Sequence, residues 1–281
     1  MRADLHSHSS ASDGTRPPGE VIRRARAAGL DAIALTDHDT VSGIPEAAAA
    51  LPPGLALVPG MELSCRWDGH SVHLLAYLFD PENPELAAQT RAIRDSRVTR
   101  AREMVARLQE LGTGVTWDQV TRIAAGGVIG RPHLARALVE NGVIADAEEA
   151  FTPEWIGAGG RAHVRRYALD PAEAIALVRA AGGVTVIAHP YAQKRDWQVP
   201  EELITALAQA GLTGIEVNHP GHDAEDRAEL TRLAGQLGLV PTGGSDDHGE
   251  LTDDRIGTEY TSGDDFRRLT AGASGAPVIR T

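Results

Sequence analysis

Histidine and carboxylate residues recur along the chain at spacings that suit the binding of divalent metal ions. His6 and His8 open the series, and residues two apart in a strand share a face, so both imidazoles can reach one ion. Neutral imidazole suits Zn²⁺, Fe²⁺ and Mn²⁺, whereas Mg²⁺ and Ca²⁺ prefer a shell of oxygen ligands. The further candidate ligands are Asp13, His38, Glu62, His73, His189, Asp246 and His248.

Several of these candidates stand where a strand is expected to end. His38 follows the apolar run 31–35, His189 ends the run 184–188, and Asp246 follows the run 239–242. In a parallel α/β barrel, the carboxyl ends of the strands form the face that carries the active site. Buried charges that are neither paired nor bound to metal are costly, so chance placement of so many ionisable groups is a poor explanation. The set therefore indicates a metal or catalytic centre.

The elements that would position these side chains alternate between strand and helix. Repeated strand–helix units predict a parallel sheet that closes into a barrel without edges. The middle of the chain shows only helical patterns, so we expect a barrel domain of residues 1–94 and 166–281 and a helical insertion, residues 95–165, that caps one face of the barrel. The apolar runs typical of buried strands cover residues 3–5, 31–35, 55–58, 71–78, 184–188, 214–217 and 239–242.

Composition and charge restrict the class of protein. The single cysteine, Cys65, cannot form an internal disulfide, which favours a cytoplasmic setting. No run approaches the roughly 18 apolar residues of a membrane span, so no membrane association is expected. The formal net charge of −12 opposes extended nonspecific binding to nucleic acid, although it allows a small anionic substrate to bind through metal.

The ordered motifs resemble those of the PHP superfamily, named for polymerase and histidinol phosphatase. They are DLHSHSSASDG at 4–14, ALTDHD at 34–39, Glu62, His73, IAHP at 187–190 and GGSDDHG at 243–249. The resemblance implies a distorted (β/α)7 barrel with two or three divalent ions on its C-terminal face. Mn²⁺ is the expected ion, with Zn²⁺ or Fe²⁺ as alternatives.

The same resemblance implies how the ligands divide among the ions. One ion would be held by His6, His8, Glu62 and Asp246. A second would share Glu62 and add His73 and His189. A third would take Asp13, His38 and His248; many relatives have His where Asp13 stands, and Asp is also a competent ligand.

Within the superfamily, the chain looks closest to nucleoside 3′,5′-bisphosphate phosphatases and to 5′-3′ exoribonucleases that act on short RNA. The segments that carry this likeness are GRPH at 130–133, inside the helical insertion, and GIEV at 214–217, followed by His222. The likeness implies that Arg131, His133 and His222 line the phosphate or substrate pocket. His222 is also a candidate acid for the leaving oxygen, whereas His189 is better placed as a ligand.

These features predict a hydrolase of phosphoric esters whose nucleophile is a metal-bridging hydroxide and whose substrate is a small phosphorylated molecule, a nucleotide or a short RNA. One alternative is a histidinol-phosphate phosphatase with the same metal centre and a different pocket. A second alternative, from another class, is a catalytically silent metal-binding interaction module. Phosphate-binding loops of the G-x-x-x-x-G-K-[ST] type and G-x-S-x-G elbows are absent from the sequence.

Overall fold

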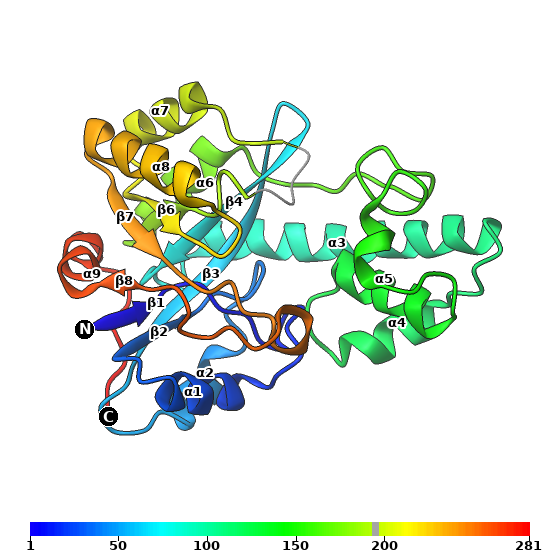
Figure 1. The fold of residues 1–281 in the computed structure, drawn as a ribbon, viewed down its shortest axis with the longest axis horizontal. Coiled ribbons are helices and arrows are strands. Elements are labelled where there is room, and N and C mark those ends of the chain that lie inside the picture. The colour runs from blue at the N-terminus through cyan, green and yellow to red at the C-terminus, as the bar shows by residue number, and fades with distance from the viewer. Residues whose placement is uncertain (193–196) are drawn as a thin grey trace.

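A computed structural model describes residues 1–192 and 197–281, and Figure 1 shows a barrel-like sheet with a helical extension on one side. The strands form one sheet in the order β7-β6-β5-β4-β3-β2-β1-β8. All seven predicted strands are present and a short eighth is added, so the expected α/β barrel is confirmed. The strands are β1 (Arg2–Asp4), β2 (Ala32–Leu35), β3 (Ala56–Trp67), β4 (His70–Tyr77), β5 (Val184–Ile187), β6 (Gly214–Asn218), β7 (Val240–Gly243) and β8 (Thr261–Ser262).

The segments that follow β1 and β7 bring the two sides of the sheet together. The backbone N–H of Leu5 donates to the Gly243 carbonyl at 3.3 Å, and that of His8 donates to the Asp247 carbonyl at 2.9 Å. Ser7 and Asp247 form a parallel bridge between them. These contacts nearly close the barrel and fix the first and last metal-binding motifs beside each other.

The sheet is not all parallel, which corrects the expectation drawn from repeated strand–helix units. β3 runs on to Trp67 and forms an antiparallel hairpin with β4, and β4 also pairs antiparallel with β5. The hairpin turns at Asp68 and Gly69, whose φ values of 45° and 83° suit the two-residue turn that an Asp-Gly pair favours. Because β3 and β4 are both long, the turn of this hairpin lies beyond the other strands of the barrel.

Helices on the outside of the barrel pack their apolar stripes against the strands. α1 begins with a proline, which has the right φ and lacks only an N–H that would be unpaired there. Its buried residues Val21, Ile22 and Ala25 form a cluster with β2 and β3. The outer helices are α1 (Pro18–Ala27), α2 (Ile44–Ala49), α6 (Pro171–Ala180), α7 (Glu201–Ala210), α8 (Ala224–Leu237) and α9 (Gly263–Thr270).

The long helix α3 (Pro84–Glu110) joins the barrel to the helical segment, as Figure 1 shows. Leu86 and Ile93 near its start belong to a barrel core, whereas Met104 and Leu108 near its end belong to a separate core. That second core also contains residues of α4 (Trp117–Ala124), α5 (Arg131–Glu140) and the 3₁₀ helix Ala147–Phe151. A core of its own supports a helical cap of residues 95–165, whose bounds remain a prediction.

A second 3₁₀ helix, Gly249–Thr252, follows the last metal-binding motif. Among the residues that the structure describes, no helix combines the length and the apolar character needed to cross a membrane.

Candidate metal centre

The nine candidate ligands predicted from the sequence lie together at one end of the barrel. Asp13 lies in the loop after β1, His38 follows β2, and His189 follows β5. Glu62 and His73 project from neighbouring positions of the β3–β4 hairpin. The remaining ligands, in the extensions of β1 and β7, are His6, His8, Asp246 and His248.

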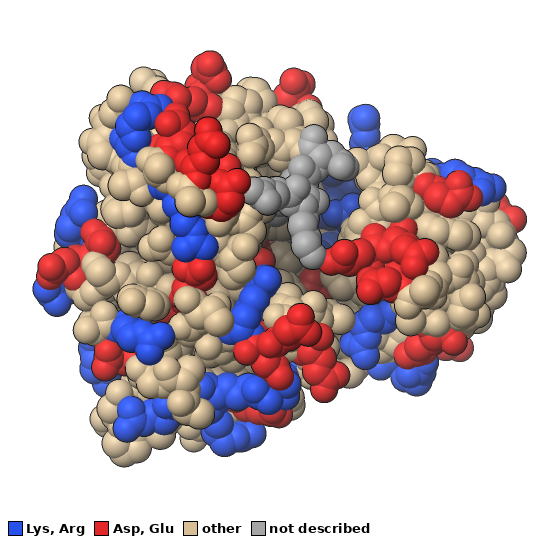
Figure 2. Space-filling view, viewed as in Figure 1, with Lys and Arg blue, Asp and Glu red and all other residues tan. Residues whose placement is uncertain are grey.

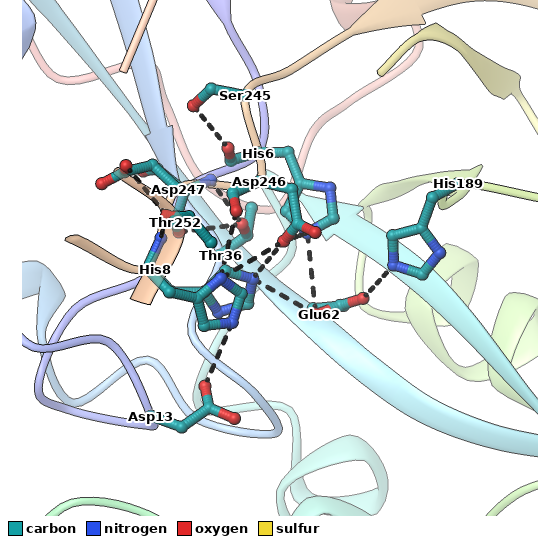
Figure 3. Close-up of polar contacts among 12 residues, drawn as sticks. His6, His8, Asp13, Thr36, Glu62, His189, Ser245, Asp246, Asp247 and Thr252 are labelled. Atoms are coloured by element: carbon teal, nitrogen blue, oxygen red, sulfur yellow. Dashed lines mark hydrogen bonds and ion pairs between the residues drawn. The ribbon is translucent and has the colours of Figure 1, made fainter. Parts of the chain in front are cut away.

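Glu62 lies at the centre of this cluster, and Figure 3 shows it between His8, which follows β1, and His189. One carboxylate oxygen lies 2.6 Å from His73 Nδ1 and 3.0 Å from His189 Nε2. The other lies 2.9 Å from His38 Nδ1 and 3.3 Å from His8 Nε2. A carboxylate whose two oxygens face different sets of imidazoles has the arrangement of a ligand shared between ions.

Asp246 and Asp13 extend the cluster on either side. One Asp246 oxygen lies 3.3 Å from Nε2 of both His6 and His8. The Asp13 carboxylate lies 3.6 Å from His38 Nε2 and 3.5 Å from His248 Nε2. Each carboxylate therefore lies between two imidazoles.

Donor atoms within 4.8 Å of one another form four overlapping groups in the described chain. The grouping resembles the division into ions implied by the family, because Asp13, His38 and His248 stay together and His6, His8 and Asp246 stay together. It differs in that His8 joins the Asp13 group, and that His73 and His189 fall into different groups around Glu62. The groups are His8–Asp13–His38–His248, His6–His8–Asp246, His6–Glu62–His189 and His38–Glu62–His73.

The chain turns sharply where β5 and β7 end. His189 has a φ of 31° and Asp246 a φ of 49°, which lie in the left-handed region that side chains other than glycine seldom adopt. Such conformations cost on the order of 1–3 kcal/mol and persist where the surroundings enforce them, often at functional sites. Here they accompany two candidate ligands.

Buried polar atoms in the cluster fit the coordination of cations. Nε2 of His6, both ring nitrogens of His8, Oδ1 of Asp13 and Nδ1 of His38 are buried and make no hydrogen bond of good geometry, although carboxylate oxygens lie close to several of them. Polar atoms in such places are costly unless something satisfies them. The donor set of imidazole nitrogens and carboxylate oxygens suits divalent cations such as Mn²⁺, Fe²⁺ or Zn²⁺, so the residues present fit a metal centre.

The electrostatics of the cluster agree with this fit. Burial raises the pKa of the Glu62 carboxyl, but His38, His73 and His6 lower it well below its usual range. Burial lowers the pKa of His8, yet the neighbouring Asp246 and Glu62 carboxylates raise it to about 10. The carboxylates thus remain ionised, and their buried negative charge needs positive charge beside it. A divalent cation provides two positive charges in a small volume, whereas imidazolium groups provide one each.

Glu216 supports the cluster from behind, and the sequence analysis gave it no role. Its carboxylate lies 3.1 Å from His6 Nδ1 and accepts the backbone N–H of His189 at 2.8 Å. Nε2 of His6 therefore faces the cluster. A lone charged residue inside the apolar strand β6 was the available signal.

His219 is a second residue that the sequence analysis left without a task. Its Nδ1 accepts the backbone N–H of Gly221 at 2.9 Å, so its Nε2 carries the proton and lies 3.2 Å from Asp246. His219 therefore orients Asp246. It follows β6 directly, so the strand-end rule that located His38 and His189 could have found it.

Asp37 and Asp39 flank His38 but organise other groups. Asp37 accepts hydrogen bonds from Ser9 and Ser12 in the loop that carries Asp13. Asp39 is fully buried and binds Arg97 at 2.7 Å. These contacts fix the loops after β1 and β2. The His38 ring takes no part in them and faces the candidate ligands.

Two of the three predicted substrate residues, Arg131 and His133, lie at the start of α5 in the cap. His133 is buried and its Nδ1 accepts the N–H of Gly130 at 2.9 Å, so it caps the start of α5. A Cβ added at Gly130 would lie 3.3 Å from Asp13 Oδ2, which places the start of α5 beside the cluster. Arg131 donates to the Ile156 carbonyl at 3.4 Å and lies over the Phe151 ring.

His222 is held by backbone groups on both sides of its ring. Its Nδ1 donates to the Val217 carbonyl at 2.9 Å, and its Nε2 accepts the N–H of Tyr191 at 3.2 Å. Burial also lowers its pKa. The ring is therefore neutral with its one proton already engaged, so this geometry gives no support to His222 as the acid.

Comparisons with known proteins give results in line with this geometry. Residues 4–113 match the family model of the PHP domain. The chain is 36% identical to a 5′-3′ exoribonuclease of Haemophilus influenzae, over 87% of this chain and 89% of that protein. It is 37% identical to a 3′,5′-nucleoside bisphosphate phosphatase of Chromobacterium violaceum, over 87% of this chain and 86% of the relative.

A solved structure extends this similarity to almost the whole chain. It comes from Bifidobacterium adolescentis, is assigned as a metal-dependent phosphoesterase, and superposes with a TM-score of 0.89 at 34% identity. The superposition covers 97% of this chain and 96% of the other, so the barrel and the helical segment are both shared.

Proposed function

The chain belongs to the PHP family and is a metal-dependent hydrolase of phosphoric ester bonds, and from this premise we propose that it removes phosphate groups or mononucleotides from the ends of nucleotides and short RNA. The two relatives described above are named for nucleoside 3′,5′-bisphosphate hydrolysis and for 5′-3′ exoribonuclease activity. The observation that carries the proposal is the cluster of nine ligands around Glu62.

We assign the ligands as the family resemblance implies. His6, His8, Glu62 and Asp246 would hold one ion, Glu62 with His73 and His189 a second, and Asp13 with His38 and His248 a third. Mn²⁺ is the proposed ion, with Zn²⁺ and Fe²⁺ as alternatives. Divalent ions in such a centre supply activation of water and neutralisation of charge on the phosphate oxygens.

The residues of this chain prepare the site for that chemistry. Glu216 and His219 orient His6 and Asp246, which keeps the ligand geometry fixed before substrate arrives. His133 caps the start of α5, and just before it the backbone N–H of Val128 donates to the Ala11 carbonyl at 3.0 Å, so we assign one wall of the proposed pocket to the cap. We keep Arg131, His133 and His222 as proposed pocket residues, without an acid role for His222. The one free cysteine is buried and supports a cytoplasmic location.

The two alternatives receive no support of their own. Among the residues that the structure describes, none of the contacts around the metal centre favours histidinol phosphate over a nucleotide. Membership of a family of phosphoesterases, with every proposed ligand position filled by a suitable residue, favours an enzyme over the silent interaction module.

The test is a comparison of substrates on protein loaded with Mn²⁺. Release of phosphate or mononucleotide is followed from adenosine 3′,5′-bisphosphate, AMP, histidinol phosphate and a 5′-phosphorylated short RNA. Activity on the bisphosphate or the RNA is expected, and we expect His8→Ala and Asp246→Ala to lower it by roughly 100-fold or more. Asp264→Ala on the exposed start of α9 is the matched control.

Two results would argue against the proposal. Turnover of histidinol phosphate alone would move the protein to a biosynthetic role. Full activity of the Asp246→Ala variant would show that the cluster around Glu62 is not the reacting centre.

A further inference from the structure

Arg255 lies beside the metal centre and contacts one candidate ligand at two points. Its Nη2 donates to the backbone carbonyl of Asp246 at 2.7 Å and lies 3.5 Å from Oδ2 of the same residue. Within residues 1–192 and 197–281, no other carboxylate forms an ion pair with Arg255. One guanidinium group therefore holds both the main chain and the side chain of Asp246.

The two carboxylate oxygens of Asp246 have different surroundings, and Figure 3 shows this side chain among the candidate ligands. Oδ1 lies 3.3 Å from Nε2 of both His6 and His8. Oδ2 lies 3.2 Å from Nε2 of His219 and 3.5 Å from Nη2 of Arg255. Oδ1 thus faces the candidate ligands, whereas Oδ2 faces two donors that have no place in the proposed ligand sets.

The loop after β7 folds back so that Arg255 reaches Asp246. Asp247 is buried, and its carboxylate accepts the backbone N–H of Gly249 at 3.0 Å and that of Arg255 at 2.8 Å. The Thr252 hydroxyl also donates to this carboxylate, at 3.2 Å. Asp247 therefore closes the loop and fixes the main chain from which the Arg255 side chain extends.

The placement of Arg255 is unfavourable for the stability of the loop taken alone. Asp253 and Asp254, which precede it, have φ values of 55° and 53°, in the left-handed region that side chains other than glycine seldom adopt. The Nε of Arg255 is buried and has no hydrogen-bond partner. Such features persist where the surroundings enforce them, often at functional sites. The contact with Asp246 gives this placement a purpose.

We infer that Arg255 is a positioning residue that, together with His219, confines Asp246 to metal binding through Oδ1. The inference rests on the proposed function and adds to it a residue that the sequence analysis did not single out. A carboxylate can offer one or both of its oxygens to a cation. A guanidinium group that holds the Asp246 carbonyl and Oδ2 together removes this freedom before an ion binds.

The test is a double-mutant cycle on Mn²⁺ affinity, measured on the full-length protein without substrate by competition with a fluorescent chelator. Arg255→Gln is expected to raise the Kd for Mn²⁺ by about tenfold or more in the wild-type background. In the Asp246→Ala background the same substitution should change the Kd by less than about twofold, because no carboxylate is left to position. Arg91→Gln, at an exposed arginine on α3, controls for the loss of one positive charge.

The Arg255→Lys variant separates position from charge. Lys keeps the positive charge but lacks the planar fork, so it should lose most of the same affinity. Tighter Mn²⁺ binding by Arg255→Gln, with wild-type affinity in Arg255→Lys, would overturn the inference, because the residue would then act only as a cation that repels the metal. Equal losses of affinity in the wild-type and Asp246→Ala backgrounds would also overturn it, since Arg255 would then only support the loop.

Turnover, measured in parallel, separates this inference from the proposed function. Coupling between Arg255 and Asp246 without hydrolysis of any of the four substrates would support the positioning role and reject the proposed function alone. Hydrolysis by the wild type without this coupling would reject the positioning role alone. A wild-type protein that binds no Mn²⁺ would overturn both.

Discussion

At the scale of single residues, the site depends on how each imidazole is oriented. An unsupported histidine can rotate and exchange its ring proton between nitrogens, which weakens its use as a ligand. The Glu216 carboxylate binds Nδ1 of His6, which prevents both rotation of the ring and exchange of its proton. His219 holds Asp246 in a similar way. These supporting residues should therefore matter nearly as much as the ligands.

The Glu216→Gln substitution tests this dependence. Gln can still accept the His189 N–H but loses the negative charge that faces His6. We expect the Kd for Mn²⁺ to rise by about 10–100-fold while the fold stays intact. Competition with a fluorescent chelator measures the Kd, and circular dichroism checks the fold.

Glu225→Gln is the matched control, because Glu225 is exposed on α8. Unchanged metal affinity in Glu216→Gln would show that His6 does not need its buried partner.

The sequence predicted the candidate ligands better than the residues that orient them, Glu216 and His219. His38, His189 and Asp246 could be located because each follows an apolar strand, and that position places side chains at one end of the barrel. Glu216 could be noticed in the sequence as a charged residue within an apolar strand, but its contact with His6 is known only from the fold. The bonds of His222 to Val217 and Tyr191 depend on loop conformations that no periodic pattern records.

At the scale of elements, α3 and the β3–β4 hairpin connect the metal centre to the cap. Arg97 of α3 binds Asp39 after β2 and Ser64 of β3, so one side chain fastens three segments. Both Arg97 and Asp39 are buried. Removal of one partner from a buried ion pair leaves an uncompensated charge.

The Arg97→Met substitution should therefore destabilise the fold strongly. We expect a loss of about 3–5 kcal/mol in the free energy of unfolding, measured by urea denaturation. The double variant Arg97→Met/Asp39→Asn removes the stranded charge and should lose less than the single variant. Asn also tolerates the φ of 55° found at residue 39. A double variant that loses the sum of the two single losses would contradict the ion-pair explanation.

The hairpin is also where the prediction of elements from the sequence was incomplete. The strands 55–58 and 71–78 were expected, but the extension of β3 to Trp67 was not. One face of the hairpin lines the site, so the strand carries the polar residues Glu62, Ser64 and Arg66 on that face. These residues interrupt the apolar pattern by which a buried strand is recognised. The Asp-Gly turn at 68–69 was a usable signal that was overlooked.

At the scale of the whole molecule, charge is distributed to favour a small anionic ligand at one place. The net charge of −12 repels extended nucleic acid, and acidic and basic side chains are interspersed over the face that Figure 2 shows. A metal centre loaded with divalent ions would attract phosphate locally. The sequence could supply the net charge but not how the charges are arranged in the fold. Arg66, Arg100 and Arg166, for example, are far apart in the chain, and only the fold brings them near one another.

The metal centre also draws its residues from strands around the barrel, so metal should stabilise the whole fold. Ligands come from the extensions of β1 and β7, the ends of β2 and β5, and the β3–β4 hairpin. An ion that binds only the folded chain adds its binding free energy to folding.

At a free Mn²⁺ concentration of about 100 times Kd, the gain in the free energy of unfolding is about 2.7 kcal/mol. With roughly 2–4 °C of Tm per kcal/mol for a domain of comparable size, Mn²⁺ should raise Tm over EDTA-treated protein by about 5–10 °C in a calorimetric scan. The Asp246→Ala variant should show a smaller shift, because one carboxylate of the cluster is gone. An equal Tm with and without metal would mean that the unfolded chain binds the ions as well as the barrel does, or that the cluster does not bind them.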